Sequence, residues 1–116
     1  MARPLPQEAR RSAEALLEAF CELRVPLHVR DRVRLSFRIK GNSVTLVENR
    51  APWRGNGNWV EIPCAQFRYN VGSHRWTLYW ADRKGRWHVY DEVAPTADFS
   101  QLLAEVERYT SGVFFG

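Results

Sequence analysis

Residues 33–49 read VRLSFRIKGNSVTLVEN, and this stretch predicts the hairpin around which the fold is organised. Its first eight residues alternate apolar and polar side chains, which is the period of a β-strand with one buried face. The Gly-Asn pair that follows is typical of a two-residue turn, and the alternation resumes after it. We therefore expect a hairpin in which Ile39 lies opposite Val44 and Phe37 lies opposite Leu46.

The polar positions of the first strand are mostly cationic. Arg34, Arg38 and Lys40 point away from the apolar face, because successive side chains of a strand alternate between the two faces of a sheet. The apolar face has to be covered by other parts of the chain, and the opposite face then stays open. The pattern therefore predicts a basic stripe on an uncovered sheet face.

Amphipathic helices are predicted near both ends of the sequence. Apolar residues recur at helical spacing over Pro6–Glu22, and Pro26 prevents the helix from continuing. Asp98 is a typical N-cap residue for a second helix, and Gln101, three positions later, completes a capping box. The apolar residues at 113–115 predict a tail that packs against the body of the protein or against a partner.

Four more extended segments are predicted between the hairpin and the second helix. Pro63 separates the first two of them and indicates a bend or a sheet edge. The sequence DRKG at 82–85 is typical of a turn with a left-handed glycine, and this turn pairs Trp80 with His88. The segments are Trp59–Ile62, Ala65–Tyr69, Trp76–Ala81 and Arg86–Tyr90.

The order of these elements defines the fold class. Consecutive antiparallel strands are usually joined as hairpins and meanders, and the helices must cover one side of the resulting sheet. We therefore expect an α+β fold, with an antiparallel meander sheet of four or five strands and an N-terminal and a C-terminal helix packed on one face. Residues 1–116 are expected to form a single domain, since this is a common domain size.

Charge is distributed unevenly along the chain. Residues 1–23 contribute −1, residues 24–90 contribute +9 and residues 91–116 contribute −4 to the formal net charge of +4. Fifteen of the 17 basic residues are arginine, which binds phosphate or carboxylate through two parallel hydrogen bonds and stacks on rings. A GC-rich genome produces the same arginine bias without any functional demand. The basic middle segment is therefore the more informative observation.

The sequence also indicates a location. Four charged side chains interrupt the first eleven residues, so no signal peptide or membrane span is expected there. Cys21 and Cys64 are isolated thiols without a C-x-x-C spacing. We therefore expect a cytoplasmic protein that has reduced cysteines and does not associate with a membrane.

The sequence contains no strong catalytic or cofactor motif. It has no phosphate-binding glycine loop, no H-E-x-x-H and no G-x-S-x-G, and its three histidines are scattered. No catalytic residue, metal site or cofactor is therefore predicted, and an enzyme is the less favoured class. Glu48 is expected on the dry face of the hairpin, where a carboxylate requires a partner, for which we expect an arginine.

Aromatic residues on the last two strands could join the basic stripe. The predicted register places Tyr79 and Trp87 on one face and His88 on the other, and the sequence does not decide which face the helices cover. Cations and rings that alternate on a sheet are what a single-stranded nucleic-acid platform requires. The candidate binding residues are Arg34, Arg38, Lys40, Tyr79, Trp87 and His88.

Three classes of function remain open on these observations. The first is a non-catalytic binding module whose basic, aromatic face takes nucleic acid or another polyanion, such as an acidic protein. The second is a protein-interaction or homodimerisation domain, since tryptophan, tyrosine and arginine are also enriched at interfaces. The third is a small metal-dependent hydrolase or nuclease that uses carboxylates, with the candidates Glu48, Glu61, Asp82 and Asp91.

Several runs of residues taken together indicate a family. They are CELRVPLHVRDRVRLSFRIKGNSVTLVENRAPW, AQFRY, WTLYWADRKGRWHVYDEV and LLAEVERYTSGVFFG. The chain resembles, over nearly its whole length, a family of short bacterial proteins catalogued only as a domain of unknown function. The resemblance implies a small bacterial protein that stands alone. It supplies no activity, cofactor or functional residue.

Overall fold

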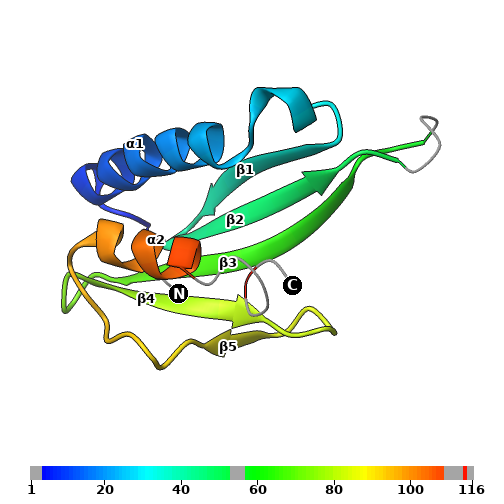
Figure 1. Cartoon of the computed structure of the whole chain (residues 1–116). Coiled ribbons are helices and arrows are strands. Elements are labelled where there is room, and N and C mark those ends of the chain that lie inside the picture. The colour runs from blue at the N-terminus through cyan, green and yellow to red at the C-terminus, as the bar shows by residue number, and fades with distance from the viewer. Residues whose placement is uncertain (1–3, 53–56, 109–113, 115–116) are drawn as a thin grey trace.

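The computed structural model describes residues 4–52, 57–108 and 114. Five strands form one antiparallel sheet in the order β1-β2-β3-β4-β5, so each strand lies beside its neighbours in the sequence. Figure 1 shows both long helices on the same side of this sheet, which confirms the predicted α+β architecture. The elements are α1 (Gln7–Arg24), the short 3-10 helix η1 (Leu27–Val29), β1 (Val33–Lys40), β2 (Ser43–Arg50), β3 (Val60–Asn70), β4 (Arg75–Ala81), β5 (Trp87–Val89) and α2 (Phe99–Arg108).

The β1–β2 hairpin has the predicted register. Ile39 pairs with Val44, and Phe37 pairs with Leu46. Gly41, at the first position of the two-residue turn, has a φ of 59°, which a residue with a side chain adopts only with strain. The positive φ is what lets eight residues of β1 pair with eight of β2 without a longer loop.

β3 differs from the sequence-based prediction. The two segments on either side of Pro63 form one continuous strand, and this strand is third of five in the sheet. The register shifts here, since Leu46 pairs with Ala65 whereas Val47 pairs with Pro63. The extra residue, Cys64, is therefore a β-bulge, which bends the strand and allows a proline within it. Pro63 marks a bulge in a central strand and not a sheet edge.

The β4–β5 hairpin confirms the predicted turn. Trp80 pairs with His88, and the amide of Asp82 donates to the carbonyl of Arg86 at 2.9 Å. Gly85 has a φ of 79°, as the left-handed position of this turn requires. The chain then returns along β4, where the backbones of Trp76 and Thr96 exchange two hydrogen bonds of 2.7 and 3.0 Å.

The ends of the helices follow from short sequence signals. α1 stops before Val25, which is extended with φ −109° because Pro26 follows it. α2 begins after Asp98, whose carboxylate Oδ1 accepts hydrogen bonds from the amide and the hydroxyl of Ser100 at 3.0 and 2.6 Å. The amide of Asp98 donates to the hydroxyl of Thr96 at 3.0 Å. Thr96 therefore satisfies the donor that the predicted capping box assigns to Gln101.

The core lies between the sheet and the two helices. Phe67, at the centre of β3, is 0% exposed, and its ring centroid lies 4.6 Å from that of Phe99 on α2. Phe99 also contacts Trp76, with a centroid distance of 4.9 Å. Leu17 of α1 and Leu102 of α2 belong to the same buried cluster. Burial of these side chains holds the helices on one face of the sheet.

The chain end also contributes to the core. Phe114 is buried, and its ring centroid lies 5.1 Å from that of Tyr90, which follows β5. This contact agrees with the expectation that apolar residues of the tail pack against the body. The predicted tail residues Val113 and Phe115 lie outside the described residues. In the part of the chain that is described, neither helix has the length and apolar character that a membrane span requires.

The central position of Phe67 gives a test of the packing. We expect Phe67→Ala to lower the free energy of unfolding by about 3–5 kcal/mol, because the substitution leaves a cavity between β3 and α2. Leu23→Ala is the control, since Leu23 is 84% exposed, and its effect should stay within about 0.5 kcal/mol. Urea denaturation of both variants measures the difference. Equal effects would contradict this description of the core.

Candidate functional site

The side of the sheet opposite the two helices carries the predicted basic stripe, and we call it the open face. Strand register fixes its members, because the partners in one row share a face. Arg38, Thr45, Gln66 and Tyr79 form one such row across four strands. Arg38 and Tyr79 therefore lie at its two ends, roughly 14 Å apart.

Cations outnumber carboxylates on the open face. Among the strand residues that the register places there, five are cationic and one is acidic. Arg34, Arg38 and Lys40 of β1 are all exposed, as the sequence predicts. A phosphate or carboxylate ligand would therefore meet a positive field over the face. The five cations are Arg34, Arg38, Lys40, Arg68 and Arg75, and the one acid is Glu61.

Two of the four arginines among these cations stack on aromatic rings. The Arg68 carbon Cζ lies 3.9 Å from the ring centroid of Tyr79, and the Arg68 Nε donates to the Gln66 side-chain oxygen at 2.7 Å. The Gln66 amide in turn donates to the Thr45 hydroxyl at 3.0 Å. The stack and this chain of hydrogen bonds hold the Arg68 guanidinium in a defined position.

The second stack lies at the other end of the open face. The Arg34 carbon Cζ lies 4.6 Å from the ring centroid of Trp59, and its Nε donates to the carbonyl of Arg30 at 2.8 Å. Arg38, between the two stacks, forms an exposed ion pair with Glu61 at 3.4 Å. Exposed pairs of this kind contribute little to stability, so Arg38 remains accessible to a competing anion.

A hollow of about 380 Å³ lies beside the Arg68–Tyr79 stack. Its walls come from β3, β4 and the two turns at this end of the sheet, and they include both polar and apolar side chains. The lining residues are Asn42, Arg68, Tyr69, Asn70, Val71, Thr77 and Tyr79.

The structure divides the predicted aromatic residues between the two faces. Trp87 pairs with Ala81, two residues beyond Tyr79 on β4, so Trp87 and Tyr79 share the open face with the β1 cations. His88 points to the helix side, where its ring stacks on Trp80 with centroids 4.8 Å apart. The structure thus brings five of the six predicted site residues to one face and places His88 on the other.

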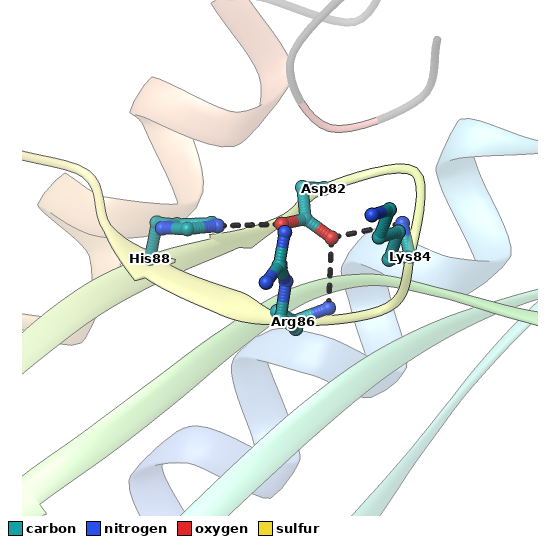
Figure 2. A network of polar contacts seen from close by, with 4 residues as sticks. All are labelled: Asp82, Lys84, Arg86 and His88. Atoms are coloured by element: carbon teal, nitrogen blue, oxygen red, sulfur yellow. Dashed lines mark hydrogen bonds and ion pairs between the residues drawn. The ribbon is translucent and has the colours of Figure 1, made fainter.

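His88 belongs to a network of polar contacts around Asp82 (Figure 2). The carboxylate of Asp82 lies 2.7 Å from the His88 Nε2, and it accepts hydrogen bonds from the amides of Lys84 and Arg86, each at 2.9 Å. The hydrogen bond to His88 and those to the two amides hold the pKa of Asp82 well below its usual range. The network ties together the β4–β5 turn.

The carboxylates named for a metal-dependent enzyme do not form a cluster. Glu48 lies on the helix side and pairs with the Arg50 Nε at 2.9 Å, which agrees with the expected arginine partner for this buried side chain. Glu61 lies on the open face, and Asp82 lies in the β4–β5 turn. Within the described ranges, no three His, Cys, Asp or Glu side chains come close enough to hold a metal ion. The geometry gives the hydrolase alternative no support.

The two cysteines are free thiols. Burial raises the pKa of Cys21 to about 11. Burial, followed by the charge of Glu48, raises the pKa of Cys64 to about 12. Both thiols are therefore protonated near neutral pH, and a protonated thiol is a poor nucleophile.

Sequence reasoning missed Arg68 and Trp59 as members of the open face. Arg68 directly follows the buried Phe67 in a strand, so the alternation rule alone would have placed it opposite the helices. Trp59 precedes β3 and reaches this face because the strand continues through the bulge at Cys64. No local sequence signal predicts that β3 continues through Pro63, since a proline in a strand usually indicates a sheet edge.

The Asp82 network gives a test by pH. Asp82→Asn should lower the free energy of unfolding at pH 7, because the charged carboxylate has better partners in the folded protein than in the unfolded chain. The depressed pKa makes this stability present above the ordinary pKa of aspartate and lost as the pH falls below it. The difference between variant and wild type should therefore shrink in acid. Urea denaturation at pH 7 and pH 3 measures it, with the exposed Asp31→Asn as the control.

Comparison with known proteins supplies a family and no function. The model of a family described as Domain of unknown function (DUF3024) matches residues 5–116. No curated protein and no solved structure matches the chain. Since the family model covers nearly the whole sequence, the protein belongs to the DUF3024 family.

Proposed function

We propose that the open face is a non-catalytic binding surface for single-stranded nucleic acid. The observation that carries the proposal is the charge of this face, where the described strand residues include five cationic side chains and one carboxylate. Phosphate groups of a nucleic-acid strand would meet the three cations of β1 and, farther across the face, Arg68 of β3 and Arg75 of β4. Most of the affinity would come from this electrostatic attraction and from release of counterions.

The two arginine–aromatic stacks favour nucleic acid over a simple anion. A base can stack on an exposed ring or on the flat side of a guanidinium group, and the Arg68–Tyr79 stack offers both together. Trp59 and Trp87 add rings to the same face. The hollow beside Tyr79 has room for one base, and its polar lining suits the edge of that base.

The proposal includes a cellular setting. It treats residues 1–116 as one domain of a bacterial, cytoplasmic protein that needs no cofactor. Free thiols at Cys21 and Cys64 suit a reducing compartment. Neither thiol is activated for catalysis, and no metal cluster occurs among the described residues, so the surface is proposed to bind and not to react.

The first test removes cations from the open face. The double variant Arg38→Gln, Lys40→Gln should bind a labelled ten-nucleotide oligo(dT) or oligo(U) more weakly than wild type in fluorescence anisotropy. Each lost phosphate contact should reduce the slope of log affinity against log salt by about 0.7, so by roughly 1.4 here. For wild type with about four contacts, affinity should fall roughly 50-fold between 50 and 200 mM salt.

The matched control removes the same charge elsewhere. Arg11 and Arg83 are exposed and lie outside the open face, on α1 and in the β4–β5 turn. The double variant Arg11→Gln, Arg83→Gln should keep the wild-type salt slope. Equal losses in the two double variants would show a response to net charge alone, and affinity that does not change with salt would overturn the proposal.

The second test separates stacking from charge. Tyr79→Leu should weaken binding of the same oligonucleotides by roughly 1–3 kcal/mol, because a base loses its aromatic partner. The salt slope should not change, since no charge is removed. Val89→Ala is the control, because Val89 is 52% exposed on the same face and carries no ring. An unchanged affinity for Tyr79→Leu would rule out stacking at this position.

A further inference from the structure

β1 leaves its outer edge open. Among the described strands it is the first in the sheet, and its one partner among them is β2. In a hairpin with a two-residue turn, the residues that flank the turn form a hydrogen-bonded pair, which here is Lys40 and Ser43. Every second residue back along β1 therefore bonds to β2, and the residues between them direct their N–H and C=O groups outward.

In the part of the chain that the structure describes, no other backbone pairs with the outward groups. The outward groups belong to Val33, Leu35, Phe37 and Ile39. No backbone hydrogen bond of the described residues reaches them, because the ladder to β2 uses the residues between them. The free edge is therefore as long as β1, with alternating donors and acceptors. Such an edge is a template for one more strand.

A groove runs beside this edge on the helix side. It has a volume of about 570 Å³ and lies between the C-terminal half of α1 and the middle of β1. Cys21 and Val25 line one wall, and Leu35 and Phe37 line the other. The charged lining residues are two glutamates of α1, Glu18 and Glu22, and two arginines, Arg30 and Arg34. The groove therefore offers apolar surface to apolar side chains, while its two acidic and two basic lining residues balance in charge.

The other side of the edge is cationic. Arg34, Arg38 and Lys40 of β1 lie on the open face. Arg34 and Arg38 are four residues apart, and Arg38 and Lys40 are two residues apart. In an added antiparallel strand, the residues opposite them form non-hydrogen-bonded pairs, whose side chains lie closest. Acidic side chains at those positions would form cross-strand ion pairs.

A second copy of β1 is a poor occupant of this edge. Antiparallel pairing through the outward groups of β1 must place even-numbered residues of one copy opposite even-numbered residues of the other. A register centred on Phe37 opposes Arg34 with Lys40, and one centred on Ser36 opposes Arg34 with Arg38. Like charges directly opposite each other destabilise a sheet. The charge pattern therefore selects a different partner.

We propose that the β1 edge binds an extended acidic segment of another protein, with acidic residues on the open face and apolar residues in the groove. The segment adds a sixth strand to the sheet. Nucleic acid does not fit this role, because it lacks the alternating amide donors and acceptors. The inference does not rest on the proposed function, since it depends on the backbone of β1 and on the groove.

Synthetic peptides test the proposal directly. The probe is a capped, labelled eight-residue peptide that alternates glutamate and valine, as long as β1. It should bind wild type at least about tenfold more tightly than a peptide that alternates lysine and valine. A peptide with four glutamates followed by four valines should also bind weakly. As a strand it cannot direct all its glutamates to the open face and all its valines to the groove. Equal affinities for the three peptides would overturn the proposal.

Methylated peptides test the backbone pairing. One peptide is N-methylated at every valine and a second at every glutamate, and only alternate amides of an added strand face β1. One of the two should lose binding by at least about tenfold, and the other should retain it. Hydrogen exchange should at the same time slow at Leu35, Phe37 and Ile39. Equal affinity of both methylated peptides, or unchanged exchange in β1, would contradict strand addition.

Variants of the protein complete the test. Leu35→Pro removes an outward N–H and leaves the ladder to β2 intact, so it should abolish peptide binding. Because this substitution also alters packing, Arg38→Glu provides a second test, in which preference should shift toward the lysine peptide. Arg11→Glu on α1 is the matched control and should change neither affinity. Tyr79→Leu should also leave peptide binding intact, which distinguishes this edge from the open face.

Discussion

A sheet that has helices on one side only can bury half of its side chains, and this constraint shapes the whole molecule. Phe67 and its neighbours occupy the buried half, where they contact Leu17 of α1 and Phe99 of α2. The other half faces away from the helices, and the polar positions of β1 lie there. On β2 this face is covered at Val47 and Thr45, which are 1% and 9% exposed. The basic character of the open face is thus a consequence of the pleat together with the choice of arginine at the polar positions of β1.

Local patterns predict most of this fold because the strands pair in sequence order. The register of the β1–β2 hairpin follows from alternation and a Gly-Asn turn, and the glycine at position 85 fixes the β4–β5 pairing. Local patterns do not predict that β3 is one strand. Its continuity through Pro63 depends on a bulge at Cys64 and on pairing with β2 and β4 on its two sides. The role of Thr96 at the start of α2 is similar, because it depends on how the chain returns along β4.

The candidate site could be predicted as far as it depends on parity, by which we mean that odd- and even-numbered residues of a strand lie on opposite faces of the sheet. Once the hairpins are in register, parity alone separates Tyr79 and Trp87 from His88, but it does not show which side the helices cover. Packing decides that question, through the apolar surfaces of α1 and α2. The stacking of Arg68 on Tyr79 and of Arg34 on Trp59 depends on side chains that come together across strands far apart in the sequence, and no local signal contains this information.

The place of β1 in the sheet has a thermodynamic consequence. This strand is both the rim of the open face and the outer edge of the sheet, so Arg38 and Lys40 belong to two surfaces at once. A negatively charged occupant of either surface would neutralise charge that the other uses. The two binding equilibria would then be negatively coupled, and each occupant would weaken the other by the same factor. Through the cationic side chains that the two surfaces share, a segment bound at the β1 edge would thereby lower the affinity of the open face for its ligand.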